Sequence, residues 1–197
     1  MLRQALDATT RPLRRLLLHT VQLDDPWKRQ PHPVPLAIYG LGATHSFSWY
    51  LEGESRVNVA CFRDVIGWLQ QCLYVSDATL YHQSDFWQHP TVFERLRQGD
   101  CEDFALWAWR KLAELDYEVE FVAGRVRSET GALQGHAWVH LHLDARSYVL
   151  DAVLDTPPLM LRPMDTVRME YLPEVSVDAQ LQRYAYHGYY QQLLASS

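Results

Sequence analysis

Residues 99–115, with the sequence GDCEDFALWAWRKLAEL, carry the clearest helical pattern in the chain. Asp100 is a good N-cap residue, and Asp103 stands three positions later, as in a capping box. The apolar residues that follow recur at spacings of three and four and predict one buried helix face: Phe104, Ala105, Ala108, Leu112 and Leu115. Cys101 falls on that face at the first helical position, so we expect its thiol to point toward whatever the helix packs on.

The hydrophobic period changes from helical to alternating directly after this helix. Residues 118–123 alternate in the manner of a strand, and residues 136–143 and 148–153 predict two more strands. The short stretch between the last two, Asp-Ala-Arg-Ser at 144–147, predicts an antiparallel hairpin. A helix followed by an antiparallel sheet indicates an α+β fold.

The remaining segments predict additions to this core. Residues 62–74 have helical spacing, and residues 26–35 contain four prolines, which favours an extended connector. Residues 1–25 are basic and amphipathic. A helix packed on the domain is favoured there over a transit peptide. The tail from Val175 returns to helical character, so residues 176–197 predict a second flanking helix. We expect one domain over residues 1–197, with a terminal helix covering the apolar face of the hairpin.

Composition and charge exclude several classes of protein. The chain has 197 residues and a formal net charge of -6, which argues against a nucleic-acid binder that relies on phosphate neutralisation. No apolar run approaches the ~20 residues of a membrane helix, and a cytoplasmic protein is expected. Three cysteines do not make a disulfide framework. Cys61 and Cys72 are interpreted as small buried hydrophobic residues.

Cys101 stands in a different environment, at the start of a helix. The helix dipole lowers the pKa of such a thiol, but the carboxylates at 100, 102 and 103 oppose it, so a neighbouring imidazolium would be needed. The hairpin offers one. If residues 144–145 form a two-residue turn, His136 lies one diagonal step from Asp151 on the same sheet face. This places an imidazole–carboxylate hydrogen bond within reach.

These residues resemble a known family. The stretches GDCEDFA at 99–105, GHAWV at 135–139 and VLD at 149–151, with DFWQHP at 85–90 before them, resemble the transglutaminase-like superfamily. The chain is most similar to the bacterial transglutaminase-like cysteine proteinases, over a core of about residues 57–177. The resemblance implies a papain-like core in which a helix packs on an antiparallel sheet.

The resemblance also implies a Cys-His-Asp triad. Cys101 would attack a carbonyl, His136 would move the proton, and Asp151 would orient the imidazole. The Cys101 backbone N–H would be one oxyanion donor, and Gln88 or Trp87 could supply a second, as in papain-like enzymes.

A calcium site is a further implication, since some of these proteinases bind calcium beside the cysteine. Asp100, Glu102 and Asp103 are the candidate ligands in this chain. The interpretation we favour is that they cap the helix and complement its dipole. No cofactor is therefore expected.

Other conspicuous residues have structural interpretations as well. His140 and His142 could share a metal, but no third ligand is obvious, and satisfied histidines are favoured. Trp138 shares a strand face with His136 and could form a wall of the cleft. The C-terminal tyrosines predict a packed helix whose surface could also hold a partner: Tyr184, Tyr186, Tyr189 and Tyr190.

The sequence thus favours a peptidase that hydrolyses a peptide or isopeptide bond through a thioester on Cys101. A transglutaminase or a protein-glutamine deamidase would use the same acyl-enzyme and differ only in the acceptor. A non-catalytic interaction module on the same fold is the alternative from another class. In the enzymatic cases a protein or peptide is the expected substrate.

Overall fold

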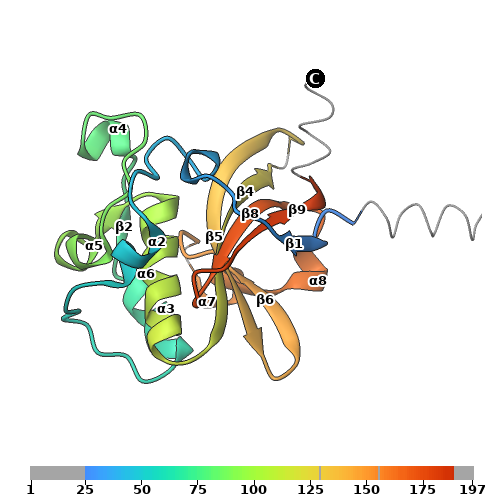
Figure 1. The fold of residues 1–197 in the computed structure, drawn as a ribbon. Helices are drawn as coiled ribbons and strands as arrows, with labels where there is room; N and C mark the ends of the chain where they lie inside the picture. The colour runs from blue at the N-terminus through green and yellow to red at the C-terminus, as the bar shows by residue number, and fades with distance from the viewer. Residues whose placement is uncertain (1–24, 129, 155, 189–197) are drawn as a thin grey trace, which may run out of the picture.

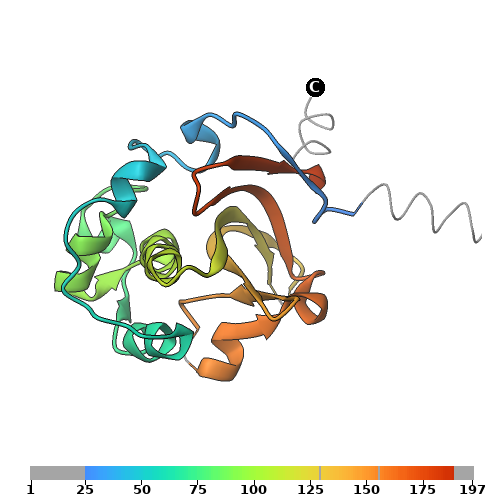
Figure 2. The same cartoon turned by 60° about the horizontal axis from the view of Figure 1, so that its bottom comes forward.

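The helix predicted at residues 99–115 is α6, Cys101–Glu114, and in the computed structural model it lies between short helices and an antiparallel sheet (Figure 1). Figure 2 looks along α6 and shows the short helices on one side and the curved sheet on the other. The structure describes residues 25–128, 130–154 and 156–188. The other elements are β1 Arg29–Pro31, η1 Leu36–Ile38, α2 Phe47–Leu51, α3 Phe62–Leu69, β2 Leu73–Tyr74, α4 Asp77–Leu80, α5 Pro90–Leu96, β3 Gln98–Gly99, β4 Glu118–Arg127, β5 Leu133–Leu143, β6 Arg146–Leu150, α7 Pro157–Met160, β7 Leu161–Pro163, α8 Met164–Val167, β8 Tyr171–Asp178 and β9 Arg183–Tyr186.

Seven of the described strands form one sheet in the order β1-β9-β8-β4-β5-β6-β7, and every neighbouring pair is antiparallel. The expected α+β fold is therefore present. The predicted hairpin is β5–β6, with Leu143 opposite Arg146. Asp144 and Ala145 both have left-handed backbone, at φ 46° and 64°, as a two-residue hairpin turn requires.

The start and the buried face of α6 follow from its sequence. The Asp103 carboxylate accepts the backbone N–H of Asp100 at 3.2 Å, so the predicted cap is confirmed. Trp107 and Trp109 are fully buried, and α6 packs on β4 and β5 through the sheet face that carries Phe121 and Val139. Burial of such aromatic side chains contributes on the order of 2–3 kcal/mol each.

The prediction that a terminal helix covers the apolar face of the hairpin is wrong, because α6 covers it. The opposite face carries a second, smaller core around Trp138. Residues from both ends of the described chain pack there, Trp27 before β1 and Tyr186 in β9. The helix predicted within residues 1–25 lies, apart from residue 25, outside the described residues.

The prediction of helix directly after Val175 is also wrong, since β8 and β9 occupy this segment. The spacing of Leu181 and Tyr184 imitates a helical repeat. However, the Asp178 carboxylate accepts the backbone N–H groups of Gln180 and Gln182 and so closes a turn between two strands. Residues 189–197 lie outside the described part of the chain.

Two smaller differences complete the comparison. The helix expected over residues 62–74 is α3, which ends at Leu69, and β2 follows at Leu73–Tyr74. The proline-rich connector is extended as predicted, and its β1 strand pairs with β9. No helix of the described residues has the length and apolar character to cross a membrane.

Candidate active site

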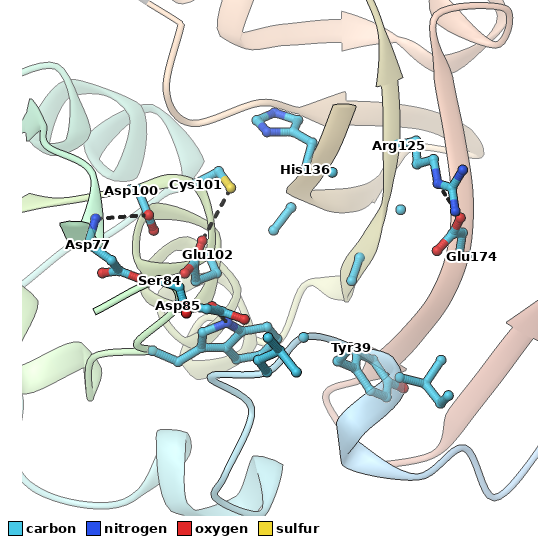
Figure 3. Close-up of a pocket in the computed structure, with 18 residues that line it drawn as sticks. Tyr39, Asp77, Ser84, Asp85, Asp100, Cys101, Glu102, Arg125, His136 and Glu174 are labelled. Carbon is cyan, nitrogen blue, oxygen red and sulfur yellow. Dashed lines mark hydrogen bonds and ion pairs between the residues drawn. The ribbon is translucent and has the colours of Figure 1, made fainter. Parts of the chain in front are cut away.

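The N-terminus of α6 and strand β5 meet at a pocket of about 490 Å³ (Figure 3). Cys101 comes from the first turn of α6, and His136 comes from β5. The pocket is lined on its helical side mainly by acidic residues, and on its sheet side by an ion pair between Arg125 and Glu174 at 2.9 Å.

His136 is held by a carboxylate from the neighbouring strand. Its Nε2 lies 2.9 Å from Oδ2 of Asp151, one residue beyond β6. This is the diagonal relationship that the hairpin register predicted. Because Nε2 is engaged with Asp151, Nδ1 is the ring nitrogen that remains for exchange of a proton with a thiol.

Asp151 is buried and has a second donor that the sequence did not reveal. The hydroxyl of Tyr171, in β8, donates to Oδ2 of Asp151 at 2.5 Å, and Arg162 donates to the Tyr171 oxygen at 2.8 Å. Burial by itself raises the pKa of Asp151, but the donors from His136 and Tyr171 outweigh it and the net pKa is lowered. Asp151 is therefore a carboxylate at neutral pH.

Cys101 is protonated in this arrangement. Its thiol donates to Oε2 of Glu102 at 3.2 Å rather than to His136. Burial raises the pKa of the thiol well above its usual range, and the neighbouring Glu102 and Asp100 carboxyls raise it further. The backbone N–H of Ala137 acts in the opposite direction but does not compensate.

A cluster of carboxyl groups surrounds the start of α6. Oxygen atoms of Asp77, Asp100 and Asp103 lie within 4.8 Å of one another, and so do those of Asp77, Asp85 and Glu102. Burial and like charge raise the pKa of Asp77 to about 6 and that of Asp103 to about 8. They also raise the pKa of Glu102 far above its usual range.

Some oxygens of this acidic cluster have no hydrogen-bond partner among the described residues. They are Oδ1 of Asp77 and Oδ1 of Asp100. Buried oxygens normally find a donor, and unpaired carboxylate and carbonyl oxygens are the ligand type that calcium prefers. The donor set therefore fits a calcium ion.

The other predicted site residues, Trp87, Gln88 and Trp138, have different positions relative to the pocket. Trp87 lines the pocket, but its indole N–H already donates to Asp85 at 2.9 Å. Gln88 is buried below the pocket, where its side-chain amide donates to Asp103 and to the Gln98 carbonyl. Trp138 is fully buried and is not among the residues that line the pocket, and its ring is stacked on that of His136 with the centroids 6.2 Å apart.

Comparison with known proteins gives distant structural similarity. The calcium-bound form of Legionella pneumophila LapG is 18% identical, with a TM-score of 0.46, over 66% of this chain and 71% of that chain. The EGTA-treated form of LapG is 18% identical, with a TM-score of 0.45, over 75% and 83%. No protein-family model and no curated protein matches the sequence.

Proposed function

We propose that the protein is a cysteine-dependent acyl-transfer enzyme, a peptidase that hydrolyses a peptide or isopeptide bond through a thioester on Cys101. The observation that carries this proposal is the hydrogen bond from His136 to Asp151, beside a pocket that Cys101 and His136 both line. A helix with a cysteine at its start, packed on a sheet that supplies the histidine, is also the papain-like arrangement that the sequence resemblance implies.

In this mechanism the thiol proton of Cys101 passes to Nδ1 of His136, and the sulfur attacks the substrate carbonyl carbon. The Cys101 backbone N–H, which has no partner within the first turn of a helix, can stabilise the oxyanion. The imidazolium then protonates the leaving amine, and a thioester remains on Sγ. Water, deprotonated by His136, releases the acid and restores the thiol.

Asp151 holds the His136 imidazole in the orientation that proton transfer from Cys101 requires. Its carboxylate holds the Nε2–H tautomer of His136 and stabilises the imidazolium that forms during attack. Tyr171 fixes the carboxylate in turn, because it donates to the same Oδ2 atom. Transamidation and deamidation require the same thioester and differ in the acceptor and the carbonyl donor.

The high pKa of Cys101 requires a means of activation, and we propose that a calcium ion in the acidic cluster supplies it. Asp77, Asp100 and Asp103, whose oxygens lie within 4.8 Å of one another, would hold the ion. A cation held there would offset the negative charge of the neighbouring carboxylates and would favour the thiolate of Cys101.

A peptide-library digestion tests the proposed activity. The full chain is incubated with a mixture of peptides, once with calcium and once with EGTA, and new termini are identified by mass spectrometry. We expect cleavage by the wild type with calcium and none by Cys101→Ala. Conversion of glutamine side chains without cleavage would identify the transferase or deamidase alternative. Absence of every acyl-transfer product, with Cys101 fully accessible to alkylation, would overturn the proposal.

A further inference from the structure

A second group of ligand-type side chains lies on the sheet face opposite α6. It consists of Glu120 in β4 and His140 and His142 in β5, and the strand register places Glu120 directly opposite His140. His140 and His142 are two residues apart and share one face, with ring centroids 4.5 Å apart. One donor atom from each of the three residues lies within 4.8 Å of the other two.

His140 is unusual because it is buried and its ring nitrogens form no hydrogen bond with any of the described residues. Its side chain is 8% exposed. Nε2 of His142 is likewise buried, and no described residue forms a hydrogen bond with it. Burial lowers the pKa of His140 to about 3, with His142 and Arg29 adding to the effect. A neutral imidazole has a lone pair on one nitrogen, and burying it unpaired is costly unless something accepts that lone pair.

Neighbouring residues form hydrogen bonds to these side chains and orient them. Residues that do not touch the metal orient its ligands in the same way in known metal sites. Oε2 of Glu120 accepts hydrogen bonds from Ser176 at 2.6 Å and Tyr186 at 3.2 Å, and Oε1 lies 3.9 Å from Nδ1 of His140. Nδ1 of His142 is hydrogen-bonded to Ser147 at 3.0 Å, which leaves Nε2 as the free nitrogen. Hydrogen bonds of this kind fix the tautomer of a histidine that binds a metal and the orientation of a carboxylate that binds a metal.

We propose that Glu120, His140 and His142 bind one divalent transition-metal ion of the zinc type. Two imidazoles and a carboxylate are a common zinc ligand set, with a fourth position left for water. The nitrogen ligands favour zinc or cobalt over calcium, so this site is chemically distinct from the acidic cluster at α6. Donor atoms around tetrahedral zinc lie about 3.3 Å apart, so small side-chain rotations suffice for closure.

Arg29 is the competitor of the metal ion. Its guanidinium forms an ion pair with Oε1 of Glu120 and lies 4.0 Å from the centre of the Tyr184 ring. The Arg29 side chain is 31% exposed, so it can turn outward into solvent when Oε1 takes the metal. Binding of the metal therefore exchanges one cation for another, and removal of Arg29 should strengthen it.

Metal titration of the full chain tests this site. The Cys101→Ser background removes the thiol of a separate Asp100–Cys101–Glu102 group. Zinc is titrated by calorimetry, and cobalt by its visible absorption, with calcium present in excess to fill the acidic cluster. We expect one equivalent of zinc to bind and to raise the unfolding temperature, because the ion binds only the folded state.

Variants of the ligands and of the competitor distinguish this site from adventitious binding. We expect His142→Gln and Glu120→Gln to weaken zinc binding at least about tenfold, and Arg29→Gln to strengthen it severalfold. His82→Asn is the matched control, because His82 is exposed and has a left-handed backbone that Asn adopts readily. His140→Gln is measured as well, and if it does not fold, His142→Gln decides, because His142 is only half-buried.

Two sets of results distinguish a specific zinc site from adventitious binding or no binding. Loss of binding in the ligand variants with a folded circular-dichroism spectrum, together with unchanged binding in His82→Asn, supports the site. Zinc binding that none of the ligand variants changes, or no binding at micromolar zinc, would overturn it.

Discussion

Nε2 of His136 lies 2.9 Å from Oδ2 of Asp151, and this contact depends on the two-residue turn at Asp144-Ala145, which lies between them in the chain. With left-handed backbone at Asp144 and Ala145, the register of β5 and β6 brings the two side chains to the same sheet face. A slip by one residue would place them on opposite faces. The turn thus places Asp151 within reach of His136.

We expect Cys101 to be alkylated faster than an ordinary thiol only when calcium is present. His136→Ala should abolish this difference. In calcium at pH 6 we expect the wild-type Cys101 to be alkylated up to about a hundredfold faster than an ordinary thiol, because an imidazolium stabilises its thiolate. Alkylation rates of each cysteine are measured by mass spectrometry across pH. Free N-acetylcysteine is the reference for an ordinary thiol, and Cys72, whose pKa burial raises to about 12, is the internal control for an unreactive buried thiol.

In EGTA we expect slow alkylation of Cys101 at neutral pH in both proteins, because its pKa is raised. Equal rates in calcium and EGTA, together with no effect of His136→Ala, would contradict both the ion pair and the role of the cation.

Tyr171→Phe should reduce activity without unfolding the protein. The substitution removes the hydroxyl that donates to Asp151 and leaves the ring, which packs 5.2 Å from Trp138. Loss of a charge-assisted hydrogen bond costs about 1.5–3 kcal/mol, which corresponds to roughly ten- to hundredfold in the reaction rate.

A purely structural role of Tyr171 would leave the pH profile of Cys101 alkylation unchanged. A positioning role predicts that the profile shifts, because the Asp151 carboxylate is less well held and stabilises the His136 imidazolium less. Arg146→Gln, at the exposed start of β6 and not among the residues that line the pocket, is a control that should not shift the profile.

Local sequence signals were sufficient to predict α6 and the β5–β6 hairpin. The apolar repeat after Asp103 has the helical period, and Asp144-Ala145 can form a tight turn, so both elements are encoded within a few residues. The placement of His136 and Asp151 on one sheet face follows from the register that this turn sets. This is why part of the candidate site could be predicted without a structure.

Contacts between distant segments could not be predicted in the same way. Tyr171 lies 20 residues from Asp151, and Glu120 meets His140 only through the register of β4 and β5, which no short turn defines. The third ligand-type residue near His140 therefore went unnoticed. Leu181 and Tyr184 are three residues apart, as on one face of a helix, but Leu181 lies in a turn and Tyr184 lies in the strand that follows it. The local pattern therefore predicted the wrong structure there.

Raising the pH in EGTA should destabilise the protein, and Asp77→Asn should remove part of this effect. The pKa of Asp77 is raised to about 6 from 3.8, so the folded state binds this proton more tightly than the unfolded state. Its stabilising contribution is complete below the unfolded pKa and is lost as the pH rises through about 6. Asp103, with a pKa raised to about 8, extends the loss to higher pH.

Unfolding temperatures between pH 4 and pH 8 measure this dependence. Asn at position 77 can still accept the Phe86 backbone N–H through its carbonyl oxygen and stays neutral, so we expect a higher unfolding temperature at pH 7. Asp116→Asn is the control, at an exposed position with left-handed backbone. The same slope in wild type and Asp77→Asn would show that Asp77 is not the titrating group.

Two glycine-to-alanine substitutions should change stability in opposite directions. A Cβ at Gly124, where β8 shifts register against β4, would lie 2.9 Å from the Pro173 Cα and 2.8 Å from the Trp138 ring. Overpacking of this kind costs about 1–3 kcal/mol. A Cβ at Gly67, inside α3, would meet no atom within 4 Å. Alanine there should stabilise the helix by about 1 kcal/mol.

For a protein of this size, 1 kcal/mol corresponds to a shift of about 2–4 °C in the unfolding temperature. Gly124→Ala should therefore lower it by several degrees and Gly67→Ala should raise it by a few. Because Trp138 stacks on His136, Gly124→Ala should also slow Cys101 alkylation in calcium, whereas Gly67→Ala should not. An unchanged alkylation rate in a destabilised but folded Gly124→Ala protein would show that Trp138 can move without displacing the imidazole.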